Sequence, residues 1–164
     1  MKIFIIMIAL ILIAILLTIR IKHVLGRRRT EFEIIQSQQL INEAMNNLFT
    51  QTSIDHSLNL PEHLNSTLIA NIWGHNVMAF EMQIEYKQRL DPKILQQSLN
   101  NELKKYCFQQ QIPQIDQEIA PIVITDLWYD QIKPILHIDV ANVNNQQTLA
   151  YLHDLKKLNQ PFQT

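Results

Sequence analysis

His137 and Asp139 are the two residues whose types and spacing could best do chemistry. They lie two positions apart in Pro134 to Val143, where apolar and polar residues alternate, and this pattern predicts a β-strand. Both side chains would point to one side, where an imidazole and a carboxylate could share a metal ion or act as an acid and base pair. A solvated strand face carries the same residue types, and no third ligand follows at a recognisable spacing. A membrane-bound hydrolase or metal-dependent enzyme using this pair is therefore our alternative interpretation.

The other polar clusters have simpler structural explanations. Asp55-His56, His63 and His153-Asp154 are scattered over expected loop and helix surfaces. A helix cap and a turn account for Trp73-Gly74-His75-Asn76, although its histidine could line a small pocket. Cys107 falls on the apolar side of an expected helix, where cysteine behaves as a small hydrophobe. There is no Walker loop, GxGxxG, CxxC or GxSxG sequence, so we assign no catalytic residue, no cofactor and no metal ligand.

The elements that must position these residues follow a β-α-β-β-α order. Alternation predicts a strand from Val77 to Lys87 with one wet face. Asp91 and Pro92 favour the start of a helix that reaches about Gln110. Two further strands, 121 to 129 and 134 to 143, form a hairpin, and a last helix begins at Asn144 or Asn145. We expect an α+β fold, a small three-stranded sheet covered by helices on one face.

The strand from Pro121 to Tyr129 is apolar on both sides. Simple alternation places Ile122, Ile124 and Trp128 on one face, and Val123, Leu127 and Tyr129 on the other. Such a strand is either central in its sheet or turns its outer side to a partner. In the second case, an exposed patch of Val123, Leu127 and Tyr129 would bind another protein or a second copy of the chain.

Two helices are expected between residues 30 and 73. Thr30 and Glu33 fit a capping box and predict a juxtamembrane helix through Leu48, followed by a linker over residues 50 to 60. Pro61 at a first helical position and Gly74 beyond a last turn predict a second helix over 61 to 73. A strand over 67 to 73 that turns at Gly74-His75 is the alternative.

The segment from Ile3 to Ile19 is seventeen residues long, and Thr18 is its only polar member. A helix of this length measures about 26 Å against the roughly 30 Å hydrocarbon core of a bilayer. Arg20 and Lys22 can extend their charges to the headgroups, so the segment predicts a single transmembrane anchor. A cleaved signal peptide is the alternative, but Leu16 to Val24 contains no small-x-small cleavage site.

The distribution of basic residues predicts the orientation of this anchor. Lys2 alone precedes the apolar segment, and five basic residues follow it: Arg20, Lys22, Arg27, Arg28 and Arg29. The positive-inside rule therefore predicts that everything after Arg20 lies in the cytoplasm. A single cysteine suits a reducing compartment. Long domains can be exported despite their charge, so an extracytoplasmic envelope assembly component with the same fold is a further alternative.

Charge is divided unevenly along the chain. The first 29 residues hold six of the 14 Lys and Arg and none of the 15 Asp and Glu, which leaves eight bases against fifteen acids, or minus seven, in residues 30 to 164. The basic segment can attract anionic lipid headgroups. Because nucleic-acid binding depends on clustered Lys and Arg, the acidic remainder argues against a DNA or RNA partner.

These patterns divide the chain into three parts: a transmembrane anchor with its basic collar (1–29), a juxtamembrane helix and linker (30–60), and a small α+β domain (61–164). The leading functional hypothesis is a non-enzymatic, single-pass protein of the cell membrane. Its domain would bind a protein partner or itself at the cytoplasmic face.

Overall fold

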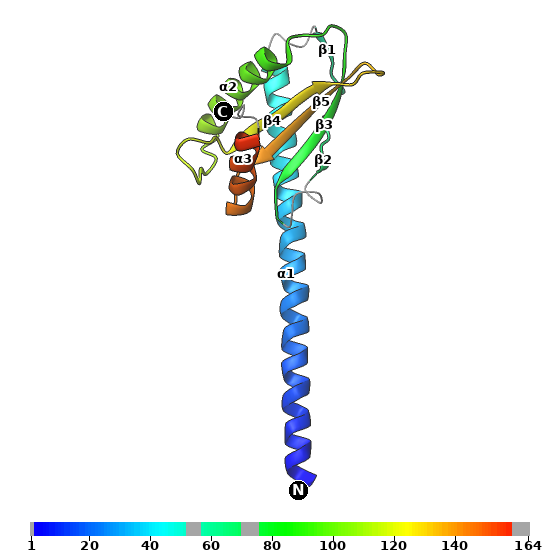
Figure 1. Cartoon of the computed structure of the whole chain (residues 1–164), viewed down its shortest axis with the longest axis vertical. Helices are drawn as coiled ribbons and strands as arrows, with labels where there is room; N and C mark the ends of the chain where they lie inside the picture. The colour runs from blue at the N-terminus through cyan, green and yellow to red at the C-terminus, as the bar shows by residue number, and fades with distance from the viewer. Residues whose placement is uncertain (1, 52–56, 70–75, 159–164) are drawn as a thin grey trace, which may run out of the picture. The chain divides into compact units, whose positions relative to one another are not determined.

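The computed structural model describes residues 2–51, 57–69 and 76–158. It has an α+β fold built from the elements labelled in Figure 1. The chain divides into two compact units, Met1–Ile35 and Gln36–Thr164, and each is treated by itself. In chain order the elements are α1 (Lys2–Gln51), β1 (Leu58–Asn59), β2 (Thr67–Leu68), β3 (Ala79–Tyr86), α2 (Pro92–Gln109), β4 (Ile122–Tyr129), β5 (Ile135–Asn142) and α3 (Gln146–Leu158).

Helix α1 joins what the sequence predicts as two separate helices. It runs without interruption from Lys2 to Gln51, so the expected helix start at Thr30 is wrong, and the helix also enters the predicted linker. The segment between the two predicted helices contains no proline, and its one glycine, Gly26, is tolerated at a modest cost. Among the residues that the structure describes, no helix combines the length and the apolar character that crossing a membrane requires.

The sheet is antiparallel throughout, with the strand order β1-β3-β5-β4 and with β2 also paired to β3. The three predicted strands are confirmed as β3, β4 and β5, and the predicted helices after β3 and β5 as α2 and α3. Strand β1 was not predicted, because two residues are too few to show alternation, whereas β2 falls within the alternative strand over 67 to 73. They extend the sheet along the outer edge of β3, with Leu58 opposite Tyr86 and Thr67 opposite Glu81.

The predicted helix over residues 61 to 73 is wrong for its described part. Residues 62 and 63 form a bend, 61 and 64 to 66 have no regular structure, and Thr67–Leu68 is strand β2, while residues 70 to 73 lie outside the described part of the chain. Helix α1 supplies the reason, because its side chains bind the amides that a helix would use. Asn46 Oδ1 accepts from the Leu64 amide at 3.1 Å, and Asn42 Oδ1 from the Ser66 amide at 3.0 Å.

One face of the sheet forms the main hydrophobic core. Its buried side chains alternate along β3 and β5, and the end of α1 and the inner side of α2 supply the facing ones. A hydrogen bond of 3.0 Å from Asn142 Nδ2 to Ser37 Oγ connects β5 to α1 within this unit. The largest contributors are Phe80, Met82 and Ile84 of β3, Leu136, Ile138 and Val140 of β5, Ile41, Met45 and Phe49 of α1, and Leu95, Leu99 and Leu103 of α2.

Helix α3 covers one end of the opposite face, so the expectation of helices on one face only is wrong. Leu149 and Leu152 pack with Ala141 and Val143, which alternate with the main-core residues of β5. Tyr151 packs beside Val77 and Ala79. Small alanines in β3 and β5 let the helix approach the sheet closely. Beyond them this face carries polar side chains, which form the candidate site.

Candidate functional site

His137 and Asp139 lie where the sequence places them, on one face of β5. Both are half-buried. Because β5 runs between β3 and β4, each has a neighbour on both sides. Gln83 and Trp128 lie opposite His137, and Glu81 and Asp126 lie opposite Asp139.

The hydrogen-bond partner of the His137 imidazole is Glu81 and not Asp139. Its Nδ1 atom is bonded to Glu81 Oε1, and its Nε2 atom lies 3.9 Å from Asp130 Oδ2. The ring stacks on the Trp128 indole, with centroids 4.9 Å apart and an interplanar angle of 9°. Both ring nitrogens therefore face acidic groups while one ring face is covered, which suits a structural contact better than the predicted acid and base pair.

Asp139 is the middle member of what we call the carboxylate row: Glu81 on β3, Asp139 on β5 and Asp126 on β4. Direct cross-strand partners share a face, so the row places three acidic residues next to one another on three neighbouring strands. Asp139 Oδ1 is buried and has no hydrogen-bond partner among the described residues. Burial, together with Glu81 and Asp126, raises the pKa of Asp139 to about 7, although His137 acts in the opposite direction. Asp139 therefore titrates near neutral pH.

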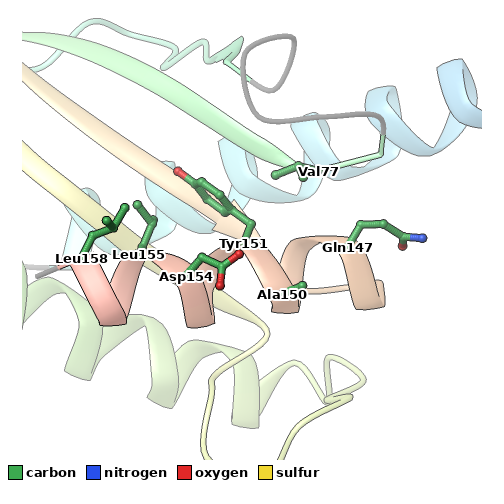
Figure 2. Close-up of a pocket in the computed structure, with 7 residues that line it drawn as sticks. All are labelled: Val77, Gln147, Ala150, Tyr151, Asp154, Leu155 and Leu158. Atoms are coloured by element: carbon green, nitrogen blue, oxygen red, sulfur yellow. The ribbon is translucent and has the colours of Figure 1, made fainter. Parts of the chain in front are cut away.

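Helix α3 meets the carboxylate row through Tyr151 and Thr125. The Tyr151 side chain extends from α3 toward the sheet (Figure 2), and its hydroxyl hydrogen-bonds with the side chain of Thr125. Thr125 Oγ1 in turn donates to the Asp139 carbonyl oxygen at 3.3 Å. Burial, followed by the nearby Asp139, raises the pKa of the Tyr151 phenol. A chain of hydrogen bonds thus links the backbone of Asp139 to α3.

Two shallow cavities flank α3, and Leu155 lines both. One has a volume of about 340 Å³ and is lined by Val77, Ala150, Tyr151 and Leu158 among others (Figure 2). The second, of about 390 Å³, lies between α3 and β4, beside Val123 and Leu152. Their walls are mainly apolar, and neither is lined by His137 or Asp139. They do not enclose the pair that a hydrolase would need.

The patch predicted from Val123, Leu127 and Tyr129 does not exist, because a bulge changes the phase of β4. The register with β5 shifts between Ile124 and Asp126, so the residues beyond it change faces. Leu127 is only 5% exposed and joins the main core, while Val123 packs against the Ile119 and Leu149 cluster.

Tyr129, the third member of the predicted patch, is also engaged within the domain. Its ring meets Tyr86 edge to face, with 4.8 Å between centroids, and its hydroxyl accepts from the Leu90 amide at 2.9 Å.

Strand β4 is an edge strand and not the central strand that its two apolar faces suggested. Helix α2 protects this edge. Asn100 Oδ1 accepts from the Ile124 amide at 2.7 Å, and Asn100 Nδ2 donates to the Ile124 carbonyl at 3.0 Å. Gln96 Nε2 donates to the same carbonyl at 3.1 Å. Side-chain amides thus replace a neighbouring strand, which blocks strand addition at this point.

The remaining sequence candidates do not come together. His63 and His153 are exposed, whereas Asp55-His56 and residues 73 to 75 lie outside the described part of the chain. Cys107 is buried, and burial raises the pKa of its thiol, which disfavours the nucleophilic thiolate. Within residues 2–51, 57–69 and 76–158, no group of three His, Cys, Asp or Glu side chains is arranged to hold a metal ion.

The sequence identified His137 and Asp139 but missed Glu81 and Asp126. Each lies on a strand that the sequence predicts, but their position opposite Asp139 depends on the order of the strands and on the β4 bulge, which the sequence does not show.

Comparisons of this chain with family models, with curated proteins and with solved structures found no match.

Proposed function

We propose that the chain is a membrane-tethered, non-enzymatic interaction or assembly protein, held in the bilayer by the first part of α1, with its α+β domain at the cytoplasmic face. The observation that carries this proposal is the exposure of large apolar side chains along that part of the helix. Ile13, Ile15, Leu16, Leu17 and Ile19 are between 49% and 63% exposed.

The distribution of these side chains around the helix supports a lipid environment. Consecutive helical residues are about 100° apart, so these five exposed side chains point in different directions around the helix instead of forming one stripe. A helix that is apolar on every side is characteristic of a buried or membrane-embedded segment. Lipid would cover the exposed side chains, and the basic residues from Arg20 to Arg29 favour a cytoplasmic position for the domain.

The geometry gives less support to the hydrolase or metal-enzyme alternative. Such an enzyme needs His137 and Asp139 beside a concave pocket, with a third ligand or catalytic group converging on them. In the structure, His137 is held by Glu81 and stacked on Trp128, and the cavities beside α3 are lined by other residues. The chain therefore fits a binding role better than a catalytic one.

Reporter fusions at the C-terminus test the placement. A fluorescent protein that matures only in the cytoplasm should be bright in the membrane fraction, and an alkaline phosphatase fusion should be inactive. An active phosphatase with a dark fluorescent fusion would show the domain outside, in agreement with the extracytoplasmic alternative. Fluorescence recovered only in the soluble fraction would contradict the tether.

Crosslinking in intact membranes tests assembly. A short lysine-reactive crosslinker should convert the full chain into one discrete larger species, since Lys105 and Lys157 have exposed side chains. Mass spectrometry of that species would distinguish a second copy from a different protein. If the chain stays monomeric at every crosslinker concentration, assembly is not its role.

A further inference from the structure

The carboxylate row is unusual because it places like charges directly opposite one another across three strands. Side chains in such cross-strand positions have Cβ atoms about 4.5 to 5.5 Å apart, and like charges there destabilise a sheet. The middle carboxylate, Asp139, also has one oxygen removed from water without a hydrogen-bond donor among the described residues. A buried oxygen with no donor favours the neutral acid over the carboxylate.

The groups that face Asp139 do not neutralise its charge. They are Glu81 from β3, Asp126 from β4, His137 from β5 and Tyr151 from α3. Of these only His137 can carry a positive charge, and its Nδ1 atom is hydrogen-bonded to Glu81. A proton on the row is therefore the simplest way to reduce the repulsion among the three acids.

We propose that the carboxylate row is a proton-binding site centred on Asp139, and that the folded domain is less stable when the row loses this proton. Thr125 and Tyr151 lie beside this site: Thr125 Oγ1 donates to the backbone carbonyl of Asp139 at 3.3 Å, and the Thr125 side chain hydrogen-bonds with Tyr151. This inference concerns the folded domain and does not depend on the membrane tether.

The direction of the effect follows from proton linkage. An unfolded aspartate releases its proton near pH 4, whereas folded Asp139 keeps it until about pH 7. Between these values the folded state binds more protons than the unfolded state, so stability falls as pH rises and then levels off above about pH 7.5. Because Asp139 is only half-buried, solvent screening reduces the effect to roughly a ten- to hundredfold change in the folding equilibrium constant.

Thermal unfolding of the full chain in detergent micelles, followed from pH 4.5 to 8.5, tests the proposal. Asp139→Asn removes the charge and keeps the shape, so its melting temperature should exceed that of the wild type by several degrees above pH 7.5. The difference should grow from pH 4.5 to about pH 7 and then stay constant. Contributions from titratable groups that do not interact with Asp139 are common to both proteins and cancel in this difference. The control Asp154→Asn, at an exposed acid of α3, should leave the wild-type pH profile unchanged.

A constant difference between wild type and Asp139→Asn at every pH would overturn the proposal. Asp126→Asn gives a second measurement should the first variant fail to fold, because Asp126 is exposed and its charge opposes ionisation of Asp139. Carbon-13 NMR of labelled aspartate carboxyls should show one group titrating near neutral pH, with its midpoint lower in Asp126→Asn. The same midpoint in both proteins, or no carboxyl titrating above pH 6, would exclude the site.

Discussion

At the scale of single residues, Asn100 shows how one side chain can terminate a sheet. It donates to and accepts from the backbone of Ile124, so β4 has a partner on its outer side although none of the described strands lies there. No pattern in the sequence indicated this role, because an asparagine on a polar helix face usually meets solvent. Only the approach of α2 to the edge of β4 makes its amide structural.

Asn100→Ala should lower the free energy of unfolding by about 1 to 3 kcal/mol, since it removes the hydrogen-bond acceptor of the Ile124 amide and one of the two side-chain donors to the Ile124 carbonyl oxygen. Gln96 retains one bond to that carbonyl, so the loss is chiefly that of the amide. Urea unfolding would measure it. Asn101→Ala, at the exposed neighbouring position, should change stability by less than about 0.5 kcal/mol. Equal effects of the two variants would refute the role assigned to Asn100.

Cys107 should react slowly with iodoacetamide in the native chain. It is buried, and the raised pKa of its thiol lowers the thiolate fraction at pH 7.5. We expect native labelling at least about tenfold slower than labelling in denaturant. Moving the thiol by one position, in Cys107→Ala with Phe108→Cys, should restore fast labelling, because Phe108 is largely exposed. Equally fast labelling of the native wild type would contradict the burial of Cys107.

At the scale of elements, the sequence predicted the three long strands and the two later helices, each of which is eight or more residues long. The long strands and both later helices begin and end close to their predicted positions, because alternation and the Asp91 cap are local signals. The region from 61 to 69 was mispredicted because Asn42 and Asn46 of α1, distant in sequence, bind its backbone. The β4 bulge was also invisible, since bulges break the period on which the prediction depends.

Leu127, which the bulge turns into the core, and the exposed Leu158 should respond differently to replacement by lysine. Leu127→Lys should destabilise the domain by more than about 3 kcal/mol, because it buries an unpaired charge in the main core. Leu158→Lys should be nearly neutral, because Leu158 is 72% exposed at the end of α3. Circular dichroism melts would separate the two. A stable Leu127→Lys protein would restore the simple alternation of β4 and the exposed patch.

At the scale of the whole molecule, α1 contains two kinds of sequence in one helix. Its first part is apolar on all sides, whereas its last turns supply Ile41, Met45 and Phe49 to the core of the domain. The composition of each part was readable from the sequence, but the absence of a break between them was not. The proposed tether is therefore continuous along the backbone with the domain that it would hold at the membrane.

The energetics of insertion make the tether open to a direct test. Thirteen of the seventeen residues from Ile3 to Ile19 are Ile, Leu or Phe. At roughly −0.3 to −0.6 kcal/mol each, they favour insertion by about 4 to 8 kcal/mol. Two arginines introduced into this segment, at roughly 2.5 to 3.5 kcal/mol each, would offset most of this favourable free energy of insertion.

Alkaline carbonate extraction of membranes from cells that express the full chain measures the tether most directly. The wild type should stay in the membrane pellet, and the double variant Ile13→Arg with Leu16→Arg should move to the supernatant. The control Ile132→Arg, at a 94% exposed isoleucine of the folded domain, should remain in the pellet like the wild type. Release of the wild type by carbonate, or retention of the double variant in the pellet, would contradict the membrane anchor.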